Sequence, residues 1–135
     1  MIKTKRLNIL KLIKNKKLNN VSKEIRTLND EIKKSRGIKD KLTNIHKNAL
    51  QNNSFKNAGN IKHKHSFDTK IIQQISLCKN REIFLENELN LAKNKLGKLI
   101  LQKNNIEDKI KLLVKQKRII EEEKIEKNTP AFKNS

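Results

Sequence analysis

The stretch that decides the fold runs from residue 71 to residue 120 and reads IIQQISLCKNREIFLENELNLAKNKLGKLILQKNNIEDKIKLLVKQKRII. Every seventh position counted from Ile71 is apolar through Ile120. A companion row begins four residues later at Ile75 and is apolar at four of its seven positions. Two such rows form the narrow seam of a coiled coil, so this segment is predicted to be a long helix packed along another helix.

The first third of the chain repeats the pattern less cleanly. One row contains Val21, Leu28, Leu42 and Ala49 with Ser35 among them, and a second row contains Leu18, Ile25, Ile32 and Lys39. This spacing predicts a helix over about 4–51. Near its start, Leu7, Leu10 and Ile13 predict that the seam shifts by about one residue. In the second helix a third row, beginning at Leu77 and Phe84, predicts a wider apolar stripe.

The two seams are separated by QNNSFKNAGNIKHKHS at residues 51–66. Asn, Ser and Gly cluster there, which predicts a loop over about 52–65 and a second helix over about 66–127. Pro130 limits that helix and leaves a tail at 128–135. The simplest way to bury both seams is to fold the chain back on itself. The predicted fold is therefore all-α, a single long two-helix antiparallel coiled-coil hairpin.

The register of the hairpin follows from its polar seam positions. If the numbers of facing residues sum to 117, Ile32 faces Leu85, and the polar Ser35 faces Glu82. Polar layers of this kind fix register at some cost in stability. In the same register residues 117–127 project beyond the first helix as an overhang.

The chain is strongly basic, with 33 Lys and Arg against 14 Asp and Glu and a formal net charge of +19. Residues 1–65 hold 18 of these basic residues and only 4 of the acidic ones. Such a chain attracts polyanions. Lys outnumbers Arg by 28 to 5, however, and Arg is the usual reader of phosphates and bases, so specific nucleic-acid binding is not favoured.

No pattern in the sequence predicts a catalytic, cofactor or metal site. His63 and His65 lack a nearby acid or Cys that would complete a metal site. Cys78 falls in the seam, where a buried apolar filler is expected, and a single cysteine suits a reducing compartment. No apolar run approaches the ~18 residues of a membrane span, so a cytoplasmic protein is expected.

The layout resembles the FliJ family of flagellar and type III export proteins, which includes YscO. The resemblance rests on the opening Leu7, Leu10 and Ile13, on HKNAL at 46–50, on FDTKIIQQI at 67–75 and on the charged segment 115–126. It implies a non-enzymatic coiled-coil stalk or adaptor that binds the export ATPase hexamer, the export gate membrane protein and export chaperones. It also implies a cytoplasmic protein that is peripheral at the inner-membrane export apparatus.

The resemblance places partner contacts at both ends of the hairpin. The end near the loop would meet the gate protein through Leu42, Ile45, His46, Phe67, Ile71 and Cys78. The open end would enter the ATPase ring with Leu7, Leu10, Ile13, Ile119, Ile120 and Ile125. Two other functions stay open: a generic coiled-coil scaffold, which would only self-associate, and a basic coiled-coil binder of nucleic acid or another polyanion, whose affinity would fall steeply with salt.

Overall fold

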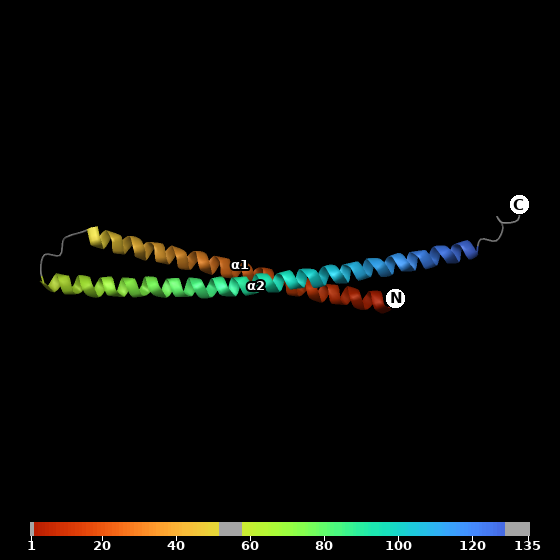
Figure 1. The fold of residues 1–135 in the computed structure, drawn as a ribbon, viewed down its shortest axis with the longest axis horizontal. Coiled ribbons are helices and arrows are strands. Elements are labelled where there is room, and N and C mark those ends of the chain that lie inside the picture. The colour runs from red at the N-terminus through yellow and green to blue at the C-terminus, as the bar shows by residue number, and fades with distance from the viewer. Residues whose placement is uncertain (1, 52–57, 129–135) are drawn as a thin grey trace. The chain divides into compact units, whose positions relative to one another are not determined.

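The computed structural model describes residues 2–51 and 58–128 of the chain. It contains two long helices, α1 (Ile2–Gln51) and α2 (Ala58–Lys127), which pack against each other (Figure 1). The described residues contain no β-strand. The predicted all-α two-helix hairpin is therefore confirmed, whereas residues 52–57 of the predicted loop, and the tail from 129 onward with Pro130, lie outside the described residues.

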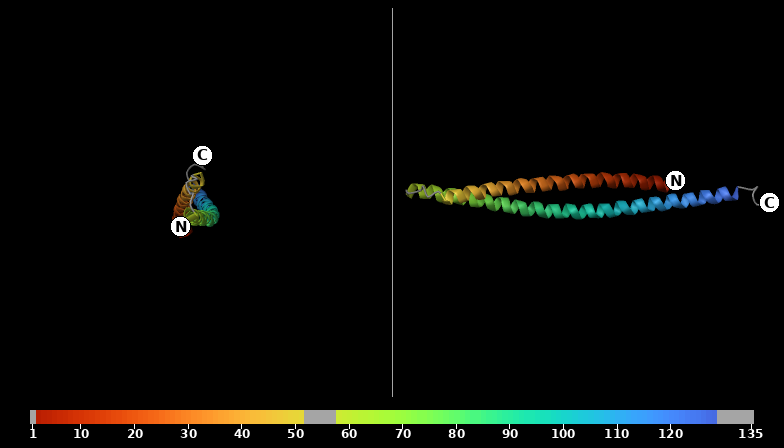
Figure 2. Two further views of the ribbon diagram at one scale, coloured as in Figure 1. Left: turned by 90° about the vertical axis from the view of Figure 1, so that its left-hand side faces the viewer. Right: turned by 90° about the horizontal axis from the view of Figure 1, so that it is seen from above.

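The internal contacts divide the chain into two units. Unit 1 comprises Met1–Val21 and Lys95–Ser135, and unit 2 comprises Ser22–Asn94. Within unit 2 the second part of α1 lies beside the first part of α2, drawn from orange to green in Figure 2. Within unit 1 the start of α1 lies beside the last part of α2, drawn in red and blue. In each unit the two segments run in opposite directions.

The predicted seam of α2 is where its side chains lose contact with water. Both rows are buried or half-buried at every position from Ile71 to Leu113. In unit 2 one core cluster consists of Ile32, Leu85 and Leu89, with Ile25 and Leu28 packed against it. Ile71 and Ala92 are buried in the same unit. In unit 1 the buried side chains are Val21 and Leu99. Each layer buries only a few aliphatic side chains, so stability is distributed along the helices.

Contacts between the helices agree with the predicted register. Lys11 pairs with Glu107 in unit 1, and Glu31 pairs with Arg81 and His46 with Asp68 in unit 2. The numbers of these partners sum to 118, 112 and 114. Arg36 pairs with Glu82 and Glu86, and Lys39 pairs with Glu82. The residue numbers of these three pairs sum to between 118 and 122. All these sums lie within five residues of 117, which is less than a seven-residue slip would produce.

The start of α1 differs from the prediction. Its seam does not shift, because the half-buried Thr4, Leu7, Lys11 and Lys14 keep unbroken seven-residue register with the rest of the helix. Leu10 and Ile13 are exposed instead. The better apolar rows farther along α1 determine which face of this continuous helix turns toward α2, and a local cluster of aliphatic residues cannot rotate it.

α2 begins at Ala58, eight residues before the predicted start at 66. Residues 58–66 contain no proline, and Thr69 Oγ1 donates a 2.8 Å hydrogen bond to the carbonyl of His65 inside the helix. Lys64 and Asp68 are half-buried and continue the seam rows backward from Ile71 and Ile75. The tertiary seam thus outweighs the local composition rich in Asn and Gly.

The third apolar row of α2 does not widen the seam. Its members are all exposed: Leu77, Phe84, Leu91, Leu112 and Ile119. Each stands one residue before a seam position and therefore about 100° away from it around the helix. The hairpin consequently carries aliphatic and aromatic side chains on surfaces that its own packing does not cover.

The helical glycines give a direct test of the continuous helices. Gly37 and Gly97 lie inside α1 and α2, and an added Cβ would meet nothing within 4 Å at either position. Replacing a helical glycine with alanine reduces the entropy lost on folding. We expect Gly37→Ala and Gly97→Ala each to raise the free energy of unfolding by about 0.5–1 kcal/mol. Urea unfolding followed by circular dichroism measures this, and a loss of stability would contradict uninterrupted helices at these points.

Candidate partner-binding surfaces

One acidic side chain organises the polar part of the seam in unit 2. One carboxylate oxygen of Glu82 accepts a 2.6 Å hydrogen bond from Arg36 Nε, and the other accepts a 3.1 Å hydrogen bond from Lys39 Nζ. Arg36 Nη2 also reaches Glu86 at 2.8 Å. The hydrogen bonds from Arg36 and Lys39 lower the pKa of the Glu82 carboxyl. The hydrogen bonds that Arg36 donates to Glu82 and Glu86 raise the pKa of the Arg36 guanidinium. Sequence reasoning missed this network because its members are 43–50 residues apart.

Ser35 does not pair with Glu82 as predicted. Its side chain is buried and its hydroxyl donates a 3.2 Å hydrogen bond to the backbone carbonyl of Cys78. The serine is short enough to approach the neighbouring helix backbone, while the longer Arg36 and Lys39 side chains reach Glu82 from the edge of the seam. The polar layer is therefore present, but with different partners.

The residues expected to form the hairpin-end surface divide between core and surface. Ile71 is only 6% exposed and belongs to the core. Leu42, His46 and Cys78 are half-buried seam residues, and Cys78 is a free thiol. Ile45 and Phe67 are the two exposed members, with Phe67 46% exposed. With α2 starting at Ala58, Ile71 lies well inside the helix and packs in the seam, so its partner contact stays a prediction.

His46 and Asp68 face each other across the seam. The distance from His46 Nδ1 to Asp68 Oδ1 is 3.6 Å, and both atoms are buried without a hydrogen-bond partner. The two groups form an ion pair only when the imidazole carries its second proton. The arrangement indicates a structural seam pair rather than a surface contact.

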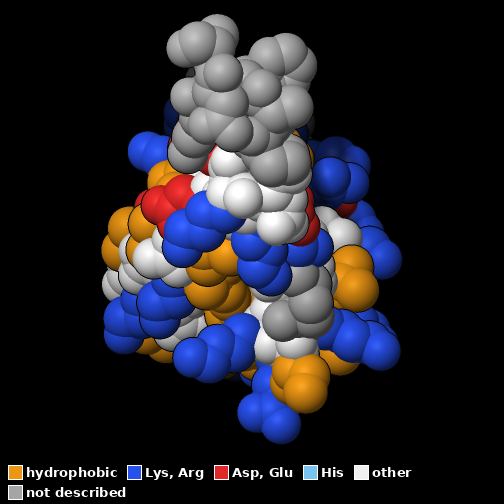
Figure 3. All heavy atoms as spheres, turned by 90° about the vertical axis from the view of Figure 1, so that its right-hand side faces the viewer, with side chains coloured by type: hydrophobic (Ala, Val, Ile, Leu, Met, Phe, Trp, Pro, Cys, Tyr) orange, Lys and Arg blue, Asp and Glu red, His pale blue; other side chains and the backbone are white. Residues whose placement is uncertain are grey.

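The open-end surface in unit 1 is built around an apolar groove. The groove has a volume of about 360 Å³ and is lined by Lys3, Arg6, Leu7, Lys109, Leu112 and Leu113. Of the six residues expected at this end, Leu7 is half-buried in the groove wall. Figure 3 shows this end with Lys and Arg side chains surrounding patches of hydrophobic ones. The groove thus combines an aliphatic floor with a basic rim.

The last part of α2 extends past the start of α1, as the predicted register requires. Every residue from Val114 to Asn128 is exposed. Ile119 is 45% and Ile120 52% exposed, and Ile125 is also exposed. A second groove, of about 500 Å³, lies where α2 passes the first turn of α1, and Ile120 lines it beside Thr4 and Leu113. Leu10 and Ile13, the remaining members of the open-end set, are exposed on α1.

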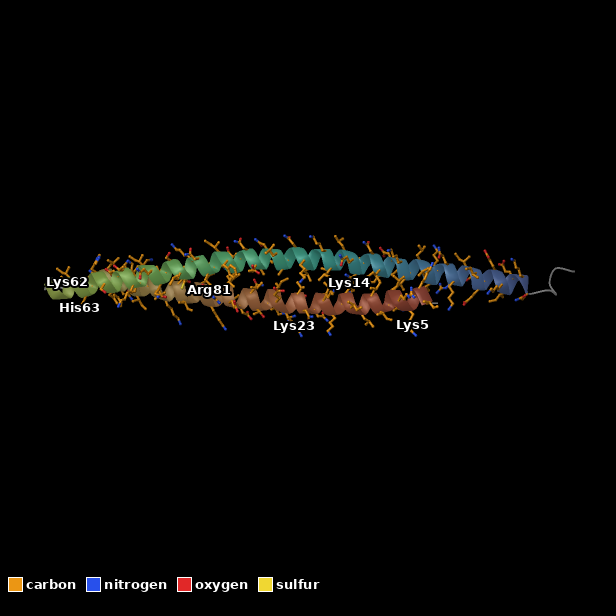
Figure 4. All side chains as sticks on the ribbon, turned by 90° about the horizontal axis from the view of Figure 1, so that it is seen from below. Lys5, Lys14, Lys23, Lys62, His63 and Arg81 are labelled. Atoms are coloured by element: carbon orange, nitrogen blue, oxygen red, sulfur yellow. The ribbon has the colours of Figure 1, made fainter. Side chains whose placement is uncertain are left out.

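The described residues show no arrangement suited to metal chemistry. Within 2–51 and 58–128 no group of three His, Cys, Asp or Glu residues could hold an ion. His63, labelled in Figure 4, lies with His65 on the exposed surface of the first turns of α2. Over the same part of the chain, neither helix has an apolar stretch that could cross a lipid bilayer.

Comparison with known protein families, with characterised proteins and with solved structures finds no match to this chain. Its candidate surfaces must therefore be interpreted from their own chemistry.

The Glu82 network predicts a pH dependence of stability. A carboxyl whose pKa is lowered by folding stabilises the fold above its unfolded pKa, and this contribution is lost as the pH falls through the lowered pKa. We expect Glu82→Gln to lower the thermal midpoint at neutral pH and to reduce the decline of that midpoint in acid. Glu86→Gln, which removes a single contact with Arg36, should have the smaller effect. Equal midpoints for wild type and Glu82→Gln at neutral pH would refute the role of the network.

The division of the hairpin-end set predicts opposite behaviour for two neighbouring residues. Ile71→Ala should lower the free energy of unfolding by about 2–5 kcal/mol, because it empties a packed seam position. Phe67→Ala should change it by less than about 1 kcal/mol, because the ring is half in water already. Urea unfolding of both variants tests this, and a larger loss for Phe67→Ala would show that the two roles are reversed.

Proposed function

We propose that this protein is a non-enzymatic coiled-coil stalk of a flagellar or type III export apparatus, which binds the hexameric export ATPase through its open end. The observation that carries the proposal is the overhang of α2. Helices of this length gain most of their stability from an apolar partner face, and an isolated short helix is marginal in water. Here Ile119 and Ile120 continue along a helix beyond the last seam layer, and both are exposed.

The chemistry of the open end supports a protein partner. The floor of the 360 Å³ groove is aliphatic, and its rim carries Lys3, Arg6 and Lys109. The overhang adds three consecutive acidic residues, Glu121–Glu123, all exposed. Apolar side chains framed by charges of both signs are typical of a protein interface with a hydrophobic centre and a polar rim. The resemblance of the sequence to FliJ proteins is the reason for proposing a ring-shaped ATPase as this partner.

The other partners implied by the resemblance belong to the same proposal. Contact with the export gate protein would use the exposed Ile45 and Phe67 in unit 2, with Leu42, His46 and Cys78 supporting them from the seam. The hairpin would also bind export chaperones and help their traffic. In each case the hairpin would act as a binding surface and leave the chemical step to its partner.

Truncation of the overhang tests the proposal. Deleting residues 117–135 should leave the thermal midpoint of the hairpin nearly unchanged, because seam burial ends at Leu113. The same deletion should abolish stimulation of the purified export ATPase and co-sedimentation with its hexamer. Both quantities are measured on the same preparation.

Deletion of residues 128–135 alone is the matched control and should leave ATPase stimulation intact. If the longer truncation unfolds the protein, the overhang belongs to the intramolecular seam. If that truncation folds and still stimulates the ATPase, the overhang is not the contact surface. If neither the full chain nor the control stimulates the ATPase, the proposed partner is wrong.

A further inference from the structure

The start of α1 has an unusual charge pattern. Between Ile2 and Lys23 the helix contains eight basic residues and no acidic one: Lys3, Lys5, Arg6, Lys11, Lys14, Lys16, Lys17 and Lys23. Two of them, Lys11 and Lys14, are half-buried toward α2. Figure 4 shows the difference in direction, with Lys14 between the helices and Lys5 on the side of α1 away from α2. Both residues belong to unit 1.

Four large aliphatic residues of this segment lie on the side facing away from α2. We define the outer face of α1 as Ile2, Lys5, Ile9, Leu12, Ile13 and Lys16. At 3.6 residues per turn these six positions fall within an arc of about 100°, opposite the half-buried Leu7, Lys11 and Leu18. Ile2 is 70% and Leu12 69% exposed, and Ile9 and Ile13 are exposed as well. Lysines thus enter the seam while four large aliphatic side chains face outward.

We propose that the outer face of α1 binds the surface of a membrane rich in anionic lipids. A basic helix with aliphatic residues on one face lies in the plane of the interface, with its apolar side chains below the headgroups. Lys5 and Lys16 lie within the same arc, among the aliphatic residues, and can extend their long stems upward to the phosphates. The segment spans about 22 Å, which follows from 1.5 Å per residue over residues 2–16.

The composition of the outer face favours lipid over other anionic partners. Nucleic acid would neutralise the lysines but would leave four aliphatic side chains in water, and the face has no aromatic ring for base stacking. A second copy of this chain would bring two basic helices together, so that like charges oppose each other. An anionic membrane satisfies both features, because its headgroups carry negative charge and its acyl region accepts aliphatic side chains.

The inference goes beyond the proposed export function and depends only on unit 1. An ATPase ring that enclosed the open end would also cover Ile13, so the membrane-bound and ring-bound states would exclude each other. The experiment therefore uses vesicles and the purified full-length chain, with no other protein present.

Because the chain contains no tryptophan, the fluorescence of a single introduced tryptophan reports membrane contact directly. Leu12→Trp places a single reporter on the outer face, and Leu91→Trp, at a position that is 62% exposed in unit 2, is the matched control. On vesicles of phosphatidylcholine with about 30% phosphatidylserine, we expect a blue shift and quenching by brominated lipid for Leu12→Trp only. Vesicles of pure phosphatidylcholine should give neither signal, and raising salt from about 0.1 M to about 0.5 M should weaken binding.

Vesicle sedimentation without a reporter supplies the second measurement. Ile9→Ser with Leu12→Ser should reduce binding to the anionic vesicles by about ten-fold or more, because two aliphatic side chains no longer enter the bilayer. Leu77→Ser with Leu91→Ser, a matched pair of exposed leucines in unit 2, should bind as wild type does.

Three results would overturn the proposal: equal loss in both double variants, unchanged binding by Ile9→Ser with Leu12→Ser, or equal blue shifts for both tryptophan reporters. A parallel binding measurement with duplex DNA distinguishes lipid binding from general polyanion binding. If DNA binds more tightly than the anionic vesicles and the serine variants affect neither, the surface is a general cation patch and the lipid assignment is wrong. Circular dichroism of each variant confirms that the helices are retained.

Discussion

Burial of one narrow apolar seam is the constraint on which the rest of the structure depends. Only seven hydrophobic side chains are buried among the described residues, and all of them lie in the two seam rows. Neither helix has another element to pack against, so each seam layer must be closed by the opposite helix. The seam lacks apolar side chains at Ser35 and at the lysines of unit 1, and its burial ends at Leu113. These positions therefore determine where the chain needs polar pairing or a partner.

The few acidic residues compensate for basic side chains in the seam. In unit 1, Glu107 lies 3.6 Å from Lys11 and 4.0 Å from Lys103, and Lys14 is half-buried in the same region. In unit 2, Glu82 performs the same task for Arg36 and Lys39. A seven-residue slip would take Glu107 away from Lys11 toward Thr4 or Leu18. Placement of scarce carboxylates among abundant lysines thus favours one register, as polar layers do in other coiled coils.

The seam of α2 could be predicted from the sequence because its apolar rows keep strict seven-residue spacing over 50 residues. The start of α1 could not, because Leu10 and Ile13 form a local apolar cluster that resembles a seam, while the true seam positions there hold Lys11 and Lys14. The early start of α2 was missed for a related reason: the Asn- and Gly-rich composition before residue 66 hid about two further turns of helix. Glu107 was missed because it flanks the seam rather than occupying a row, and its role depends on how far lysine side chains reach.

The start of α1 shows that folding alone does not account for this sequence. A helix that served only the hairpin would place its aliphatic residues in the seam and its lysines in water. Here five large aliphatic residues are exposed between positions 2 and 13: Ile2, Ile9, Leu10, Leu12 and Ile13. The hairpin tolerates this arrangement because the well-formed seam farther along α1 holds the helix in place. Since the exposed aliphatic residues contribute little to that seam and cost solubility, stability does not account for their placement, which is the reason for proposing a membrane contact on this face.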